Sequence, residues 1–193
     1  MNIRATAITV AAILAGLATQ ARAAANDALW EALKSGGQVI LMRHTVTPPG
    51  VGDPPGMRID DCSTQRNLTD EGRRHAKRIG EAVRAHGIAI DKVLSSPMCR
   101  CLETARLAFN RVDESQPVAN TFSRSEAEMP RQVREMRALA GEKRRGGNAV
   151  LVSHGTTIQA VTGLATEPGE MVIVTPQGEG FFELKGKLMP APP

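Results

Sequence analysis

The stretch that decides the fold is Gln38-Val39-Ile40-Leu41-Met42-Arg43-His44, in which a short apolar run ends in two basic side chains. Two later apolar runs end similarly: Val93-Leu94-Ser95 leads through a short turn to Arg100, and residues 149–153 lead directly to His154. Short apolar runs that alternate with helical patterns predict βαβ units and a parallel sheet. Because ligands of such sheets bind outside the carboxyl ends of the strands, we expect two arginines and two histidines to share one crevice.

The segments between these runs carry the start and stop signals of helices. Thr69 is a favourable N-cap and Gly87 a favourable stop for a helix with one apolar stripe. Ser96 and Pro97 suit the N-cap and first helical position of the next helix. The patterns predict an α/β domain with a largely parallel sheet flanked by helices. The predicted helices are 25–33, 69–86, 96–109, 130–140 and 156–162, and the late strands are 170–175 and 180–184.

Residues 47–66 fit neither pattern, because they hold four prolines and three glycines. A long loop directly after Arg43-His44 indicates a functional segment. Within the predicted helix 69–86, His75 and His86 are expected to be surface or capping residues, since neither lies at a strand end. The basic pairs of that helix, Arg73-Arg74 and Lys77-Arg78, are expected to form a solvated face.

The residue types in the crevice suit a phosphate group. Arginine matches phosphate oxygens with a planar fork of N–H donors, and a neutral histidine can attack phosphorus. Taken singly, Arg43 and Arg100 could be ion-paired structural arginines, and His44 and His154 could be buried histidines with satisfied hydrogen bonds. Their joint position at strand ends favours a phosphate site.

Three motifs carry a family resemblance: Leu41-Met42-Arg43-His44, Ser95-Ser96-Pro97 to Arg100 with Glu103-Thr104-Ala105, and Ser153-His154-Gly155. In order and spacing they resemble the histidine phosphatase (phosphoglycerate mutase-like) superfamily, from about residue 37 to about residue 184. The resemblance implies a three-layer domain that needs no metal or organic cofactor. Residues 61–69 and Cys99-Arg100-Cys101 are similar to an exported bacterial branch that includes lipopolysaccharide core heptose phosphate phosphatases.

The resemblance also implies roles for single residues. His44 would be the nucleophile that forms a phosphohistidine, and Arg43, Arg100 and His154 would hold the phosphoryl oxygens. Glu126 would be the general acid, with Glu128 as the next candidate. The predicted substrate-binding residues are Thr45, Gly155 and Arg66. Thr45 replaces the family's usual glycine but still offers a hydroxyl and an N–H, and Arg66 would bind either a substrate phosphate or an exposed acid.

The first residues resemble a secretory signal cleaved after Ala23, because Arg4 precedes an apolar stretch and Ala21-Arg22-Ala23 fits the cleavage rule. The apolar stretch, residues 5–18, is shorter than the about 20 residues that span a bilayer. We therefore expect residues 1–23 to be a signal peptide and residues 24–193 to form one histidine phosphatase domain in a periplasmic or secreted protein with no membrane span.

Cysteines of an exported protein are disulfide candidates, so Cys62 is expected to pair with Cys99 or with Cys101. Zinc would require paired spacings such as C-x-x-C, which the sequence lacks. The chain has 24 basic and 20 acidic residues, and two of the basic residues belong to the expected signal. So small an excess, with no tyrosine and one tryptophan, does not favour nucleic-acid binding.

The sequence therefore predicts an exported phosphomonoesterase acting on small phosphorylated substrates, in particular phosphorylated envelope sugars. The alternatives are a phosphohistidine-protein phosphatase, a phosphomutase, and a catalytically silent protein that binds phosphorylated ligands. A serine hydrolase would require a G-x-S-x-G elbow, which the sequence lacks. Oligomeric state stays open.

Overall fold

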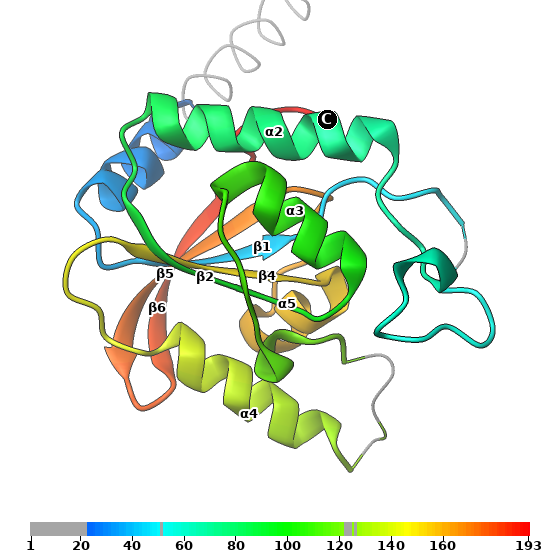
Figure 1. Cartoon of the computed structure of the whole chain (residues 1–193). Helices are drawn as coiled ribbons and strands as arrows, with labels where there is room; N and C mark the ends of the chain where they lie inside the picture. The colour runs from blue at the N-terminus through cyan, green and yellow to red at the C-terminus, as the bar shows by residue number, and fades with distance from the viewer. Residues whose placement is uncertain (1–22, 51, 122–124, 126) are drawn as a thin grey trace, which may run out of the picture.

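The computed structural model describes residues 23–50, 52–121, 125 and 127–193. Six strands form one sheet in the order β3-β2-β4-β1-β5-β6 (Figure 1). β1, β2, β3 and β4 pair in parallel, whereas β5 and β6 add an antiparallel edge. The predicted, largely parallel sheet is therefore confirmed. The strands are β1 Val39–Arg43, β2 Ile90–Ser95, β3 Asp113–Glu114, β4 Asn148–Ser153, β5 Met171–Gly178 and β6 Phe181–Leu188.

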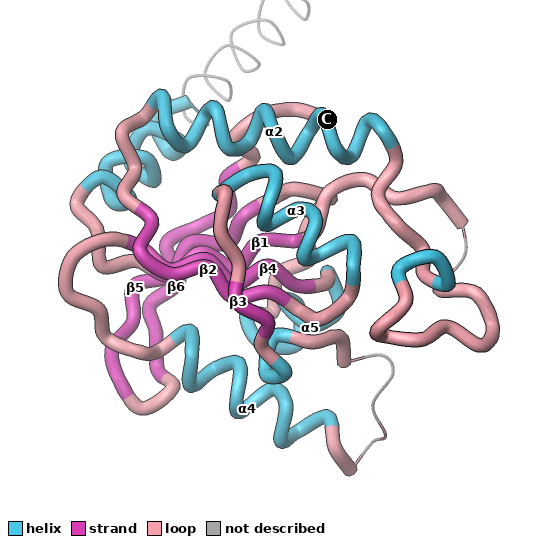
Figure 2. Tube along the Cα trace, in the orientation of Figure 1, coloured by secondary structure: helices cyan, strands magenta, loops and turns pink. Residues whose placement is uncertain are grey.

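Helices cover both faces of the sheet, as Figure 2 shows. The helix over residues 23–34 is the one predicted from residue 25 onward. α2 and α3 lie on one face, and α4 and α5 lie on the other. The bounds are α2 Asp70–Ala85, α3 Cys99–Phe109, α4 Met129–Ala140 and α5 Gly155–Thr162, with single 3-10 turns η1 Cys62–Thr64 and η2 Gln116–Val118.

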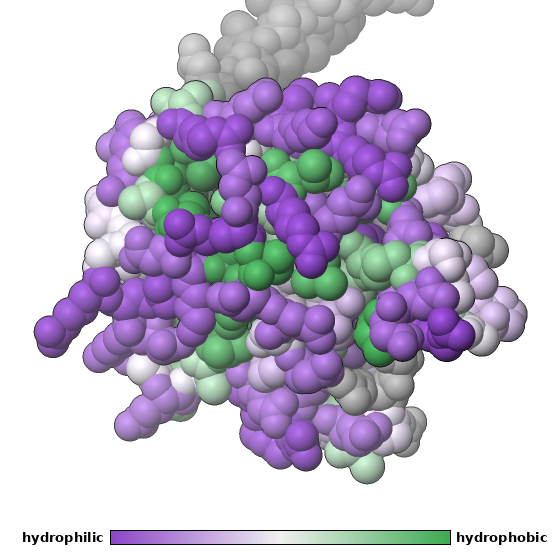
Figure 3. Space-filling model, viewed as in Figure 1, coloured by the Kyte–Doolittle hydropathy of each residue, from purple (hydrophilic) through white to green (hydrophobic). Residues whose placement is uncertain are grey.

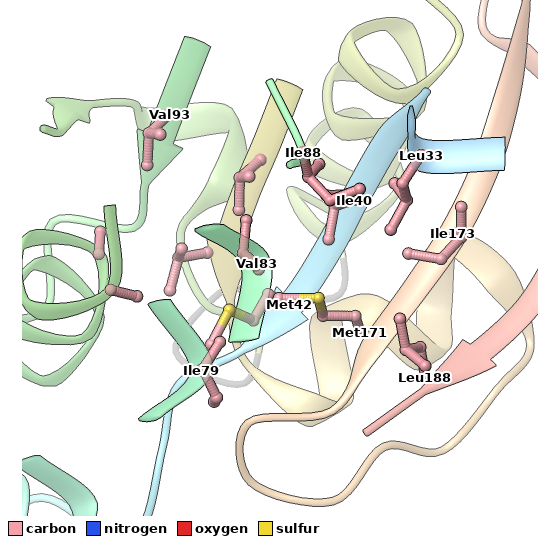
Figure 4. Close-up of a cluster of buried hydrophobic side chains, with 14 of the residues drawn as sticks. Leu33, Ile40, Met42, Ile79, Val83, Ile88, Val93, Met171, Ile173 and Leu188 are labelled. Carbon is pink, nitrogen blue, oxygen red and sulfur yellow. The ribbon is translucent and has the colours of Figure 1, made fainter. Parts of the chain in front are cut away.

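The alternation of side chains along the strands divides the core between the two faces. Ile40 and Met42 of β1 pack beneath α2 and α3, whereas Val39 and Leu41 pack towards α4 and α5. In the close-up of the first cluster, Met42 lies next to Met171 of β5 (Figure 4). Burial on both faces explains why β1 has a continuous apolar run instead of an alternating one.

Two local predictions are corrected. Helix α3 starts at Cys99 with Met98 as its N-cap, whereas Ser96 lies before the helix, where its hydroxyl is 2.9 Å from Nε2 of His154 and accepts the N–H of Met98 at 3.4 Å. His75 is fully buried, and its ring bonds the carbonyl of Ala191, so it is not a surface residue. His86 does cap the C-terminus of α2, as expected.

Polar side chains cover the outer surface of α2 in the face viewed in Figure 3. Arg74 and Arg78 pair with Glu71, and Arg73 pairs with Glu103 of α3. These basic residues thus form the solvated face that was predicted. Among the described residues, no helix is long and apolar enough to cross a membrane.

A disulfide from Cys62 to Cys99 decides between the two pairings that the sequence left open. It ties η1, within the loop of residues 47–66, to the first turn of α3. Gln65 adds a second anchor, because its side chain accepts the Cys99 N–H and donates to the carbonyls of Arg58 and Ile59. The remaining thiol, Cys101, is buried.

Candidate active site

A cavity of about 280 Å³ lies at the carboxyl ends of the parallel strands. Arg43 ends β1, His154 follows β4, and Arg100 lies in the first turn of α3. The structure thus brings together the two arginines and two histidines predicted from the strand ends, together with Arg66 and Gly155. The lining residues are Arg43, His44, Arg66, Arg100, His154, Gly155, Thr156, Gln159, Ala165 and Thr166.

His44 is buried, and a hydrogen bond determines which of its two ring nitrogens carries the proton. Its Nδ1 lies 2.8 Å from the carbonyl oxygen of Thr45. Because a carbonyl only accepts hydrogen bonds, Nδ1 carries the proton and Nε2 keeps the lone pair. Burial, reinforced by the charges of Arg100 and Arg43, lowers the pKa of His44 to about 3. The ring is therefore neutral at physiological pH, and Nε2 is nucleophilic.

The two arginines are both held by their terminal nitrogens. Nη1 of Arg43 donates to the carbonyl of Thr166 at 2.5 Å. Nη1 and Nη2 of Arg100 donate to the two carboxylate oxygens of Asp53 at 2.8 and 3.2 Å. The Nε atoms of Arg43 and Arg100 are buried and have no hydrogen-bond partner among the described residues. Since buried donors are almost always paired, the two guanidiniums are prepared for an anionic ligand.

Sequence reasoning missed Asp53, which holds Arg100 from behind the cavity, and four residues of the cavity wall: Thr156, Gln159, Ala165 and Thr166. Besides holding Arg100, Asp53 accepts the backbone N–H of Arg66 at 3.0 Å. The only signal for it was an acidic residue within a loop already expected to be functional, with nothing to indicate that its partner would be Arg100. The structure places Arg66 itself on the cavity wall, where burial and the charge of Arg100 lower its pKa.

His154 approaches His44 edge to face, with ring centroids 5.4 Å apart. Its Nε2 lies 2.9 Å from the hydroxyl of Ser96 and 3.5 Å from the sulfur of Cys101. Burial lowers the pKa of His154 well below its ordinary value, and the charges of neighbouring groups lower it further. A neutral imidazole at this position can donate an N–H to a phosphate oxygen without adding a positive charge to the cavity.

The two small residues beside the histidines have different positions. Thr45 does not line the cavity: its hydroxyl donates to the Gly72 carbonyl, and its N–H donates to Thr104, so the expected contact with phosphate is corrected. Gly155 does line it. A Cβ on Gly155 would lie 3.4 Å from Nε of Arg43, so the guanidinium packs against the start of α5 at about van der Waals distance.

The predicted general acid, Glu126, lies outside the described residues. Glu128 bonds to Ser125 at the start of α4 and lines a different cavity, with Gln116 and Arg131, so the structure does not bring it to the site. Among the described residues, no group of three or more histidine, cysteine or acidic side chains is arranged to hold a metal ion.

The fold and this cluster define an α/β protein with a cavity lined by arginine and histidine side chains at the ends of its parallel strands. A model of the histidine phosphatase superfamily (branch 1) matches residues 39–123, which include His44, Arg66 and Arg100. Over these residues, 85 of the 193 in the chain, the protein is similar to the histidine phosphatase superfamily.

Similar proteins include the mitochondrial serine/threonine-protein phosphatase Pgam5. The protein from Drosophila virilis is 36% identical over 80 residues, which is 42% of this chain and 25% of the relative. The protein from Drosophila persimilis is 35% identical over 101 residues, or 51% of this chain and 32% of the relative. The chain thus spans only about a quarter to a third of the length of these curated relatives.

Solved structures share the fold over most of both chains. The product of the open reading frame Rv3214 from Mycobacterium tuberculosis has a TM-score of 0.59 and 22% identity, covering 77% of this chain and 95% of its own. The protein histidine phosphatase SixA, complexed with tungstate, has a TM-score of 0.55 and 15% identity, covering 79% and 97%. At these identities the likeness shows the fold alone.

Proposed function

We propose that this chain is a metal-independent phosphomonoesterase that works through a phosphohistidine on His44. The observation that carries this proposal is the neutral ring of His44 between two guanidiniums whose buried Nε–H groups have no partner among the described residues. Fixed donors around a nucleophile are what phosphoryl transfer needs, because its catalysis is mostly positioning and charge stabilisation.

In the first step, Nε2 of His44 attacks phosphorus while the bond from phosphorus to the leaving oxygen breaks and that oxygen takes a proton. The phosphorylated ring then carries positive charge, and the Nδ1–H bond to the Thr45 carbonyl stabilises it. Water next attacks phosphorus, which releases orthophosphate and restores the neutral ring. Arg43, Arg100 and His154 line the cavity where the phosphoryl oxygens would lie during both steps.

The size of the cavity does not select one substrate class. At about 280 Å³ it holds a phosphate group with room for part of the molecule that carries it. This suits phosphate on a sugar of the bacterial envelope, which is the substrate we favour for a protein exported by a signal in residues 1–23. It equally suits phosphate on a protein, and the names of Pgam5 and SixA support a protein phosphatase as the second candidate.

Glu126 is the proposed donor of the leaving-group proton. A general acid matters only when the leaving oxygen is a poor leaving group. Glu126→Gln should therefore slow hydrolysis of a sugar phosphate far more than hydrolysis of an aryl phosphate. Equal losses on both substrates, or no loss on either, would remove Glu126 from the mechanism.

The test of the function is turnover by purified protein on a panel of phosphosugars, phosphopeptides and free metabolites, with and without excess chelator. Brief exposure to labelled substrate should leave an acid-labile, base-stable phosphoryl group that is absent from His44→Ala. Tight binding of orthophosphate without turnover of any substrate would instead indicate a silent phospholigand-binding protein. Loss of turnover in chelator, with recovery on adding metal, would refute the metal-free mechanism.

A further inference from the structure

Asp53 and Arg100 form a buried, two-pronged ion pair behind the phosphate cavity. The Asp53 side chain is 8% exposed and that of Arg100 is fully buried. Asp53 lies in the loop after β1, which the disulfide from Cys62 fastens beside the start of α3 at the right of Figure 1. Arg100 lines the cavity, whereas Asp53 does not. The carboxylate therefore contacts the guanidinium from outside the space that a substrate would occupy.

Asp53 binds one edge of the Arg100 guanidinium, and this determines which of its N–H groups remain available to a ligand. The carboxylate bonds to Nη1 and Nη2, which form the end of the fork, and the Arg66 carbonyl takes a further Nη1 hydrogen at 3.3 Å. A guanidinium has five N–H groups. Nε–H and the second Nη2–H lie together on the side of the fork, and the buried Nε has no partner among the described residues. This side is the one left for a two-pronged bond to phosphate.

We propose that Asp53 is a positioning residue, which holds the end of Arg100 so that the Nε edge of the guanidinium faces the phosphoryl group. The proposal rests on the function proposed above, since it assumes that phosphate binds in this cavity. A flexible arginine could turn either edge towards a ligand, whereas one clamped by a carboxylate and a carbonyl offers a single edge. Asp53 also offsets one of the three positive charges around His44 before substrate binds.

The experiment compares Asp53→Asn with Asp61→Asn. Asp61 is a matched control because it lies in the same loop and pairs with an arginine, Arg58, that does not line the cavity. We expect Asp53→Asn to lower kcat/KM for p-nitrophenyl phosphate by about 100-fold, the loss typical of a misplaced catalytic group, and to weaken inhibition by orthophosphate. Asp61→Asn should leave both unchanged. Wild-type protein that neither turns over nor binds phosphate would refute the proposed function itself.

Two further variants separate positioning from other roles. Asp53→Glu keeps the charge but moves the carboxylate by one methylene, so a folded protein with the same loss of phosphate binding supports positioning even if Asp53→Asn fails to fold. In the Arg100→Ala background, Asp53→Asn should have no further effect on turnover. Tighter phosphate binding by Asp53→Asn would show that Asp53 competes with substrate. A loss confined to alkyl phosphates, with phosphate binding intact, would make Asp53 a proton donor. Either result overturns the proposal.

Discussion

The chain has two pairs of histidines, and only one pair lies in a site. His44 and His154 lie at the strand ends, with Arg43, Arg66 and Arg100 around the same cavity. His75 lies on α2 and bonds the Ala191 carbonyl, and His86 caps the C-terminus of α2 and stacks on Trp30 with ring centroids 3.8 Å apart. Burial alone does not identify the site histidines, because His75 is as inaccessible as His44, although His86 is only half-buried.

The two buried histidines differ in the number of positive charges around them. Desolvation lowers the pKa of both His44 and His75; three arginines lower that of His44 further, whereas near His75 the charge of Arg78 is opposed by that of Glu71. The histidines of α2 contact backbone carbonyls and an indole, so they contribute to packing. A buried histidine becomes a candidate nucleophile where unsatisfied arginine donors share its cavity.

The largest expected effect tests this contrast directly. His44→Ala should lower turnover by at least about 10⁴-fold, since a nucleophile and its clamp act as a unit. His86→Ala should keep wild-type turnover and lose only about 1 kcal/mol of stability with the ring stack. Steady-state rates and thermal unfolding of both variants provide the measurements. If both variants lose turnover to a similar extent, the two histidines do not differ in catalytic role, and the losses reflect destabilised protein.

This contrast could be predicted from the sequence only in part. The position of His44, Arg100 and His154 after apolar runs was sufficient to place them together, because parallel strands deliver their ends to one edge. The burial of His75 depends on the chain's last residues packing across α2, which no local pattern reveals. Asp53 was missed because irregular loops have no periodicity from which side-chain direction can be inferred.

The next effect concerns the disulfide, which anchors the loop beside the site histidines. Cys62 and Cys99 are 37 residues apart, so breaking the bond should cost about 4 kcal/mol in the chain-entropy model. Cys99→Ala should lose this amount in denaturant unfolding, whereas Cys101→Ala should lose far less. Denatured, non-reduced protein made in an oxidising compartment should show one free thiol. Three free thiols would contradict the bond.

A smaller effect is expected from acid. Because the pKa of His44 is about 3 in the folded protein, below the ordinary value of 6.5, the folded state binds fewer protons than the unfolded state. This contribution to stability is fully present above about pH 6.5 and is lost as the pH falls towards 3. Between pH 7 and pH 5, wild type should lose about 2 kcal/mol more than His44→Asn. Parallel pH profiles of the two proteins would refute the low pKa.

The smallest effect concerns how His154 is held. Ser96 and Ser95 are adjacent and fully buried, and each makes a hydrogen bond of 2.9 Å, but only Ser96 reaches a site histidine; Ser95 bonds the carbonyl of Ser96. Removing either hydroxyl should cost about 1 kcal/mol. In Ser96→Ala the ring of His154 should be held less firmly in its catalytic orientation, which should lower the kcat/KM of the folded protein about five-fold. In Ser95→Ala only the free energy of unfolding should fall, and kcat/KM should stay unchanged. If both variants lower kcat/KM equally, the end of β2 acts as one structural unit, and Ser96 has no separate part in holding the ring that faces His44.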